Sequence, residues 1–154
     1  MHFVNEKLLV GNVDDAQKPP PFVNSVLFLS GEHNIKPPRG VAYHHIPFKE
    51  YSEASPADVK EAVDWLEQQP PNARIMVCCR AGMGRSVSMA IAYLVLVKGM
   101  KYAEAESLLR ARRPGATPIP HLERTIERVR QLRQGRDGQG QGQPSMPGAA
   151  PSRI

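Results

Sequence analysis

The most informative segment of the chain reads RIMVCCRAGMGRS and spans residues 74–86. Consecutive apolar residues at Ile75–Val77 predict a short buried strand. The next residues, Arg80–Arg85, contain two glycines and predict a tight loop, and Ser86–Lys98 predicts an apolar helix that Gly99 ends. A strand, a tight loop and a helix N-terminus in this order suit anion binding, because loop amides and the first helical N–H groups converge on one point.

This loop carries the side chains that phosphate chemistry requires. Gly82 and Gly84 permit unusual backbone angles and the close approach of a ligand. Arg85 offers a planar guanidinium that can hold two oxygens of one phosphate. Cys79 lies at the mouth of this positively charged loop, where a thiolate would be stabilised. Because a thiolate that faces a bound phosphate can attack phosphorus, the segment predicts covalent phosphoryl chemistry.

The spacing Cys79-x5-Arg85, with Ser86 next, resembles the signature loop of the cysteine-dependent protein tyrosine phosphatase superfamily, and CRAGMGRS resembles its dual-specificity branch. The resemblance implies that Cys79 is the nucleophile, that Arg85 clamps the phosphoryl oxygens and that the Ser86 hydroxyl eases departure of the thiolate. It implies that the reaction forms and then hydrolyses a cysteinyl-phosphate, with no metal or other cofactor. It also implies that the loop binds the phosphate through Arg80, Ala81, Gly82, Met83 and Gly84.

The resemblance covers about residues 3–133 and includes three segments outside the loop. LLVGN at residues 8–12 resembles the opening strand and turn of the branch. RRP at residues 112–114 resembles its C-terminal pattern, which implies that Arg113 braces the loop from below; an exposed position is the alternative. IPFKE at residues 46–50 resembles the segment that carries the general acid of the family.

Two positions depart from the family pattern. The family uses an Asp as general acid where this chain has Glu50, and Glu53 is the next candidate; a site without a dedicated acid is the third possibility. The family has a His at the position of Cys78. We expect the Cys78 side chain to point into the core, with a redox role of the Cys78–Cys79 pair as the alternative.

Local sequence signals predict the remaining elements. Ser55 suits a helix N-cap, with Pro56 at the first helical position and Asp58 completing a capping box, and Pro70 ends that helix. The other expected elements are strands at 7–10, 25–30 and 41–46 (the last ended by Pro47), a helical turn at 13–17, and helices at 102–113 and 119–132. Strands that alternate with helices predict an α/β fold with a central, mostly parallel sheet flanked by helices.

The composition sets limits on partners and location. We expect residues 1–134 to form one catalytic domain and residues 135–154, rich in Gly, Pro and Gln, to be disordered. The chain has a formal charge of +5, and eight arginines between residues 110 and 136 outnumber two glutamates there. Such a region attracts nucleic acid, anionic lipid or phosphorylated substrates, but no zinc-finger spacing or aromatic-studded basic motif supports nucleic acid.

The cysteines, the histidines and the apolar runs bear on metals and compartment. Five scattered histidines and two adjacent cysteines do not match a zinc pattern, so we expect no metal. The N-terminus has no signal-peptide h-region, and no apolar stretch reaches the about 20 residues that span a bilayer. We therefore expect a cytoplasmic monomer with reduced thiols and no transmembrane segment.

These observations predict a phosphomonoester hydrolase that acts on phosphotyrosine and on phosphoserine or phosphothreonine. Its partner would be a phosphorylated protein or another phosphomonoester. A phosphoinositide phosphatase and a phosphate-binding module with little catalysis are the alternatives. A rhodanese-like sulfurtransferase is disfavoured by the Cys79-x5-Arg85 spacing with Ser86, and a low-molecular-weight arsenate reductase by the position of the loop at mid-chain.

Overall fold

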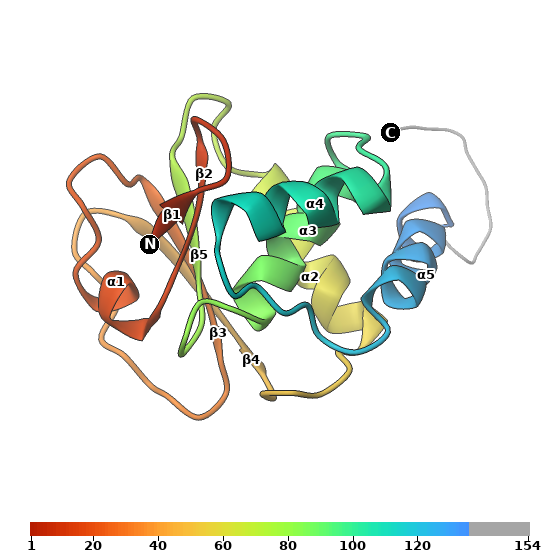
Figure 1. Cartoon of the computed structure of the whole chain (residues 1–154). Helices are drawn as coiled ribbons and strands as arrows, with labels where there is room; N and C mark the ends of the chain where they lie inside the picture. The colour runs from red at the N-terminus through yellow and green to blue at the C-terminus, as the bar shows by residue number, and fades with distance from the viewer. Residues whose placement is uncertain (136–154) are drawn as a thin grey trace.

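The computed structural model describes residues 1–135 and contains a five-stranded sheet (Figure 1). The sheet order is β1-β2-β5-β3-β4; β1 pairs antiparallel with β2, and the other neighbours pair in parallel. The predicted α/β class with a mostly parallel sheet is confirmed. Disorder was predicted for residues 135–154, and residues 136–154 lie outside the described residues. The strands are β1 (His2–Phe3), β2 (Leu8–Gly11), β3 (Ser25–Ser30), β4 (Ala42–Phe48) and β5 (Ile75–Cys78).

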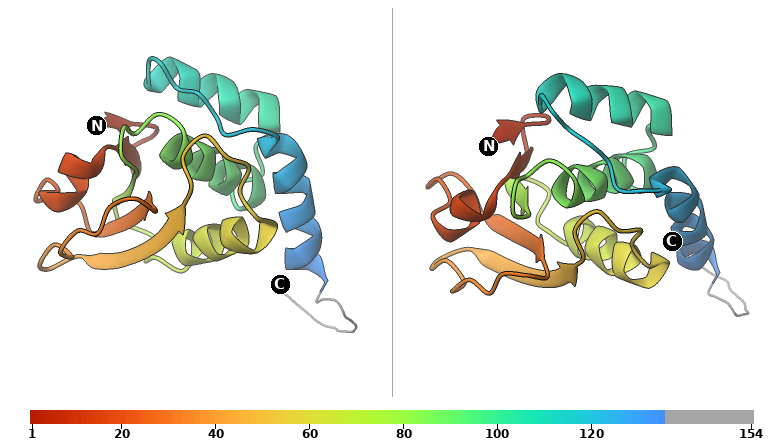
Figure 2. Two further views of the ribbon diagram at one scale, coloured as in Figure 1. Left: turned by 90° about the horizontal axis from the view of Figure 1, so that it is seen from below. Right: turned by 60° about the horizontal axis from the view of Figure 1, so that its bottom comes forward.

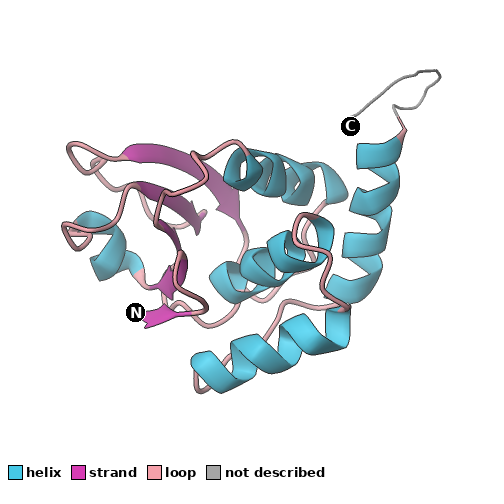
Figure 3. Cartoon of the chain, turned by 90° about the horizontal axis from the view of Figure 1, so that it is seen from above, coloured by secondary structure: helices cyan, strands magenta, loops and turns pink. Residues whose placement is uncertain are grey.

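Helices cover both faces of the sheet, as Figures 1 and 2 show. The short helix α1 (Val13–Gln17) lies on one face over a small apolar cluster. The other four lie on the opposite face over the larger core, and Figure 3 shows the same layers from above. Among the described residues, no helix is long and apolar enough to cross a bilayer. These four helices are α2 (Pro56–Glu67), α3 (Arg85–Leu96), α4 (Tyr102–Arg112) and α5 (Leu122–Gln134).

Strand β5 lies in the middle of the sheet and leads into the informative loop. Its side chains alternate, so that Met76 and Cys78 face α1 whereas Val77 and Cys79 face the larger core. Cys78 is fully buried, as predicted, and burial raises the pKa of its thiol well above its ordinary value. Both cysteines are free, and their side chains face opposite sides of the sheet. This geometry disfavours the redox-pair alternative.

The end of β4 differs from the prediction. The strand continues through Pro47 to Phe48, although the sequence predicted an end at Ile46. β4 is an edge strand, and its register with β3 shifts between Phe28 and Ser30. A proline is tolerated at an edge or an irregularity, because its missing N–H removes no necessary bond there.

Several helix boundaries also differ from the prediction, by one to three residues. The last helix begins at Leu122 and not at Ile119, because His121 has a left-handed φ of 58° that an α-helix does not contain. The Ile119 N–H donates to the buried Ser88 Oγ at 2.9 Å. This hydrogen bond ties the connection between α4 and α5 to helix α3. Helix α3 ends at Leu96 and not at Lys98. Such differences at helix ends leave the position of the informative loop unchanged.

Candidate active site

The carbonyls of the loop after β5 all accept hydrogen bonds from groups outside the loop. Within one trans peptide, the C=O and the following N–H point in opposite directions. Each loop carbonyl accepts a hydrogen bond from outside the loop, so the N–H groups of residues 81–85 face away from these donors. The five pairs are Arg80 O with Val13 N, Ala81 O with Arg113 Nη2, Gly82 O with Arg113 Nε, Met83 O with Thr117 N, and Gly84 O with Ser88 N.

Arg113 braces this loop from below. Its Nε donates to Gly82 O at 3.0 Å, its Nη2 donates to Ala81 O at 3.1 Å, and its Nη1 lies 2.5 Å from His2 Nδ1. Gly82 has a φ of 72°, and a Cβ there would lie 2.5 Å from Arg113 Nη2 and 2.7 Å from Gly11 O. Arg113 is therefore buried against the loop, and the exposed alternative from the sequence is excluded.

Cys79 and Ser86 meet at the two ends of the loop. Cys79 follows β5, Ser86 lies in the first turn of α3, and both are buried. The Cys79 Sγ lies 3.4 Å from the Ser86 Oγ, within hydrogen-bonding reach. When the thiol is deprotonated, the Ser86 hydroxyl is the donor in this contact, so it can stabilise a thiolate.

Arg85 is held by a carboxylate that the sequence reasoning missed. Its Nη1 and Nη2 donate to Glu32 Oε1 at 2.6 Å and Oε2 at 2.9 Å, and Nη1 also donates to Phe48 O at 3.0 Å. The hydrogen bonds from Arg85 are the main cause that lowers the Glu32 pKa to about 2. An arginine has five N–H donors, so the Nε–H and the second Nη2–H of Arg85 are left for a ligand.

Glu50 lies beside the loop, where the segment after β4 passes the start of α3 (Figure 2). Its Oε2 accepts hydrogen bonds from Arg80 Nη2 at 2.6 Å and Nε at 3.0 Å. The same oxygen lies 3.7 Å from Arg85 Nη2. A cavity of about 510 Å³ opens here, and Glu32, Lys49, Glu50 and Arg80 are among the residues that line it.

The other carboxylates considered from the sequence lie elsewhere. Glu53 pairs with Arg124 of α5 at 3.2 Å. Asp58 lies at the start of α2, where its backbone N–H donates to the Ser55 Oγ at 3.1 Å, as expected for an N-cap. Of the two candidate acids, the structure therefore brings Glu50, and not Glu53, to the loop after β5.

Only one of the two missed site residues, Ser88 and Glu32, carried a signal in the sequence. Ser88 is a fully buried polar residue in an apolar helix, and its Oγ donates to Gly84 O at 2.7 Å. Its polarity within that helix was a sign of a local hydrogen-bonding role. Glu32 gave no local signal, but it follows β3, and the carboxyl ends of parallel strands meet at one edge of a sheet.

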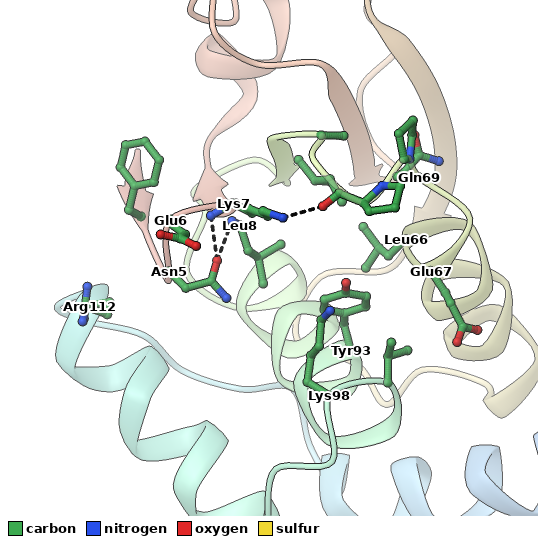
Figure 4. A pocket seen from close by; sticks show the side chains of 16 residues that line it. Asn5, Glu6, Lys7, Leu8, Leu66, Glu67, Gln69, Tyr93, Lys98 and Arg112 are labelled. Atoms are coloured by element: carbon green, nitrogen blue, oxygen red, sulfur yellow. Dashed lines mark hydrogen bonds between the residues drawn. The ribbon is translucent and has the colours of Figure 1, made fainter.

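A larger cavity of about 930 Å³ lies at the opposite end of the sheet, and Figure 4 shows the residues that line it. Leu8 and Ile75, the first residues of β2 and β5, line it. Lys7 Nζ donates to Pro71 O there at 2.5 Å. Ligands of parallel α/β sheets bind at the carboxyl ends of the strands, so this cavity is not the expected site of the reaction despite its size.

Residues 24–132 match the family model described as the catalytic domain of dual specificity phosphatases. The chain belongs to this family. Dual specificity protein phosphatase 15 of Mus musculus is 28% identical over 125 residues, which is 78% of this chain and 53% of the relative. The dual specificity protein phosphatase Mpk3 of Drosophila melanogaster is 29% identical over 84 residues, which is 53% of this chain and 20% of the relative.

The fold is shared with solved structures of this family. Human DUSP28 superposes with a TM-score of 0.75 at 21% identity, over 87% of this chain and 98% of that chain. The matched regions make up 53% of the length of the mouse relative and 20% of the length of the fly relative. The similarity thus covers the catalytic domain and leaves the remaining parts of those longer relatives unmatched.

Proposed function

We propose that this domain hydrolyses the phosphomonoester bonds of phosphotyrosine, phosphoserine and phosphothreonine, and that the reaction passes through a cysteinyl-phosphate. The observation that carries the proposal is the joint placement of Cys79, Ser86 and Arg85 around one loop whose carbonyls are all held from outside it. Family membership supports it. The loop can bind the phosphate oxygens and stabilise the charge of the transition state without moving.

In the first step, the Cys79 thiolate attacks phosphorus, and the bond between phosphorus and the leaving oxygen breaks. The loop N–H groups bind the non-bridging oxygens. The free edge of the Arg85 guanidinium, Nε–H with the second Nη2–H, has the fork geometry that matches two phosphate oxygens. Glu32 and the Phe48 carbonyl hold the other edge, so Arg85 is oriented before the substrate arrives.

Glu50 is proposed as the general acid of this step. A proton on its carboxyl group passes to the leaving oxygen, which departs as an alcohol or a phenol. In the second step, Glu50 takes a proton from water as the water attacks phosphorus. The cysteinyl-phosphate bond then breaks, and the Ser86 hydroxyl donates to the departing thiolate. Arg80 must release Glu50 for this role, because Glu50 Oε2 accepts hydrogen bonds from both Nε and Nη2 of Arg80.

The ion pairs of the arginine-rich C-terminal region favour a phosphoprotein over a phosphoinositide. A lipid-binding face needs free cations, but much of the arginine-rich C-terminal region is engaged within the protein. We therefore infer a phosphorylated protein as substrate. We also propose a monomer in a reducing compartment such as the cytoplasm, where both free thiols stay reduced. The engaged pairs are Arg110 with Glu106, Arg124 with Glu53, Arg130 with Glu127, and Arg133 with Asp64 and Glu67, while Arg113 is buried.

The test is phosphate release from a chromogenic aryl phosphate in the presence of EDTA. The wild type should turn over, and Cys79→Ser should be inactive although it is folded. If the reduced, folded wild type is inactive as well, the catalytic proposal is wrong. The phosphate-binding module would then be the better description, and Cys79→Ser and wild type should bind phosphopeptides equally.

A further inference from the structure

His2 contacts the side chain that braces the loop after β5. Its Nδ1 lies 2.5 Å from Arg113 Nη1, although the two residues are 111 positions apart in the sequence. Arg113 is 5% exposed, and its Nε and Nη2 donate to the carbonyls of Gly82 and Ala81. Within residues 1–135, His2 is the only hydrogen-bond partner of the Nη1 group. Arg113 therefore has two hydrogen bonds to the loop and one to His2.

Strand β1 places the His2 ring at this position. β1 lies beside β2 at the edge of the sheet, where His2 is paired with Val10 (Figure 1). On the other side of His2, the amino group of Met1 lies 3.4 Å from Asp15 Oδ2 of α1. The backbone of the strand is thus held next to the loop, and the ring is free to interact with Arg113.

The hydrogen bond between His2 and Arg113 requires a neutral imidazole. A guanidinium has only N–H donors and no acceptor. His2 Nδ1 is therefore the acceptor, and the ring carries its proton on Nε2. A protonated imidazole has an N–H on both nitrogens and cannot accept. Protonation of His2 thus removes the hydrogen bond and puts a second positive charge against Arg113.

The groups that face His2 favour its neutral form. The pKa of His2 is lowered from its ordinary value of 6.5, first by desolvation of the ring, then by the charges of Arg113 and the Met1 amino group. Asp15 of α1 acts in the opposite direction, and β2 carries no ionisable side chain. The hydrogen bond is therefore present at pH 7 and is lost as the pH falls below 6.5 through the lowered pKa.

We propose that His2 is a positioning residue, whose neutral ring keeps Arg113 against the loop after β5 and whose protonation slows the reaction. The proposal rests on the proposed function, in which this loop binds the phosphate oxygens. His2 acts through Arg113 and not on the substrate. A small displacement of a binding loop lowers the rate, because the reacting groups are no longer aligned. The effect should be smaller than that of removing Arg113, which keeps its two hydrogen bonds to the loop when His2 is protonated.

Two substitutions separate the hydrogen bond from the titration. His2→Asn keeps an acceptor at every pH, because Asn Oδ1 and His Nδ1 are both bonded to Cγ, and it cannot be protonated. His2→Leu has no acceptor. His121→Asn is the matched control, because His121 is an exposed residue at the start of α5, and Asn tolerates its left-handed backbone.

The readout is kcat on an aryl phosphate from about pH 4.5 to about pH 7.5. At the upper end, His2→Asn should equal the wild type, and His2→Leu should be about threefold slower. Toward the lower end, the ratio of His2→Asn to the wild type should rise about threefold, and the wild type should approach His2→Leu. Titration of Cys79 and Glu50 is common to these enzymes and cancels in the ratios. His121→Asn should match the wild type throughout.

Two outcomes overturn the proposal. The ratio of His2→Asn to the wild type can stay constant with pH, or His2→Leu can match the wild type at about pH 7.5. The proposed function fails separately, if the folded wild type turns over no phosphomonoester. The affinity for inorganic phosphate is then measured in the Cys79→Ser background with His2 and with His2→Asn. The ratio of the two affinities should shift about threefold in favour of His2→Asn toward acid pH, and a constant ratio contradicts the proposal.

Discussion

Glu50 accepts two hydrogen bonds from Arg80, whereas Glu53 pairs with Arg124 on α5. This difference gives the general-acid assignment a matched control three positions away. Glu50→Gln cannot donate the proton, so kcat for an alkyl phosphate should fall about 100-fold. An aryl phosphate, with its better leaving group, should lose less.

Glu53→Gln should keep the activity of the wild type on both substrates. Steady-state kinetics of the two variants on one alkyl and one aryl phosphate measure the difference. Equal losses for Glu50→Gln and Glu53→Gln, or no loss for either, would refute the assignment of Glu50.

Glu32 holds one edge of the Arg85 guanidinium and should matter for both catalysis and acid stability. Glu32→Gln removes the carboxylate that binds both Nη groups of the buried Arg85, and misplacement of the guanidinium should lower kcat/KM about tenfold. Because the folded state lowers the Glu32 pKa from 4.5 to about 2, the pair stabilises the fold above pH 4.5. That contribution is lost as the pH falls from 4.5 toward about 2.

Denaturation of wild type and Glu32→Gln across this pH range tests the linkage. The wild type should be more stable at pH 7, and the two curves should converge as the pH falls toward about 2. The gap should be modest, because the Glu32 side chain is 37% exposed and solvent screens the pair. A gap that is unchanged by pH would show that the Glu32 charge does not act through Arg85.

Helix α4 supports the loop after β5 through Arg113, the residue that follows the helix. Arg113 holds two loop carbonyls, whereas Arg112, the last residue of α4, is exposed. Arg113→Ala should lower kcat at least about tenfold, because the loop carbonyls lose their partners and the loop can shift. It should also destabilise the fold by about 1–3 kcal/mol.

Arg112→Ala is the matched control for this effect. It removes the same kind of side chain one position earlier and should leave kcat and stability close to wild type. Activity assays and urea denaturation of the two variants give the comparison. An Arg113→Ala variant with normal kcat would show that the loop keeps its shape without the brace.

The elements that position the site were predictable where local patterns determine them. β3 and β5 are continuous apolar runs, and the Ser55 N-cap was visible in the sequence. The extension of β4 through Pro47 was not predictable, because it depends on the edge position of the strand. Glu32 was missed for a similar reason: it is 53 residues from Arg85 in the sequence, and the sheet brings them together.

The whole molecule is stabilised by burial more than by its surface charges, and α5 tests this. Ile126 is 2% exposed in the core, whereas Arg124 is 57% exposed in its ion pair with Glu53. Ile126→Ala should cost about 2–5 kcal/mol of unfolding free energy. Arg124→Ala should cost less than about 1 kcal/mol.

Urea denaturation at low and at high salt measures both effects. The loss in Ile126→Ala should not depend on salt, and the small loss in Arg124→Ala should shrink as salt screens the pair. A larger loss for Arg124→Ala than for Ile126→Ala would mean that ion pairs, and not apolar contacts, hold α5 against the rest of the domain.

The most direct test of a thiolate mechanism is the capture of its covalent intermediate. The wild type is mixed with an aryl phosphate, quenched within milliseconds in denaturant, and digested for mass spectrometry. We expect one phosphoryl group on the peptide that contains Cys79, located on that residue, and none in Cys79→Ser. Turnover without any phosphoryl group on Cys79, or a phosphoryl group on another residue, would contradict the mechanism.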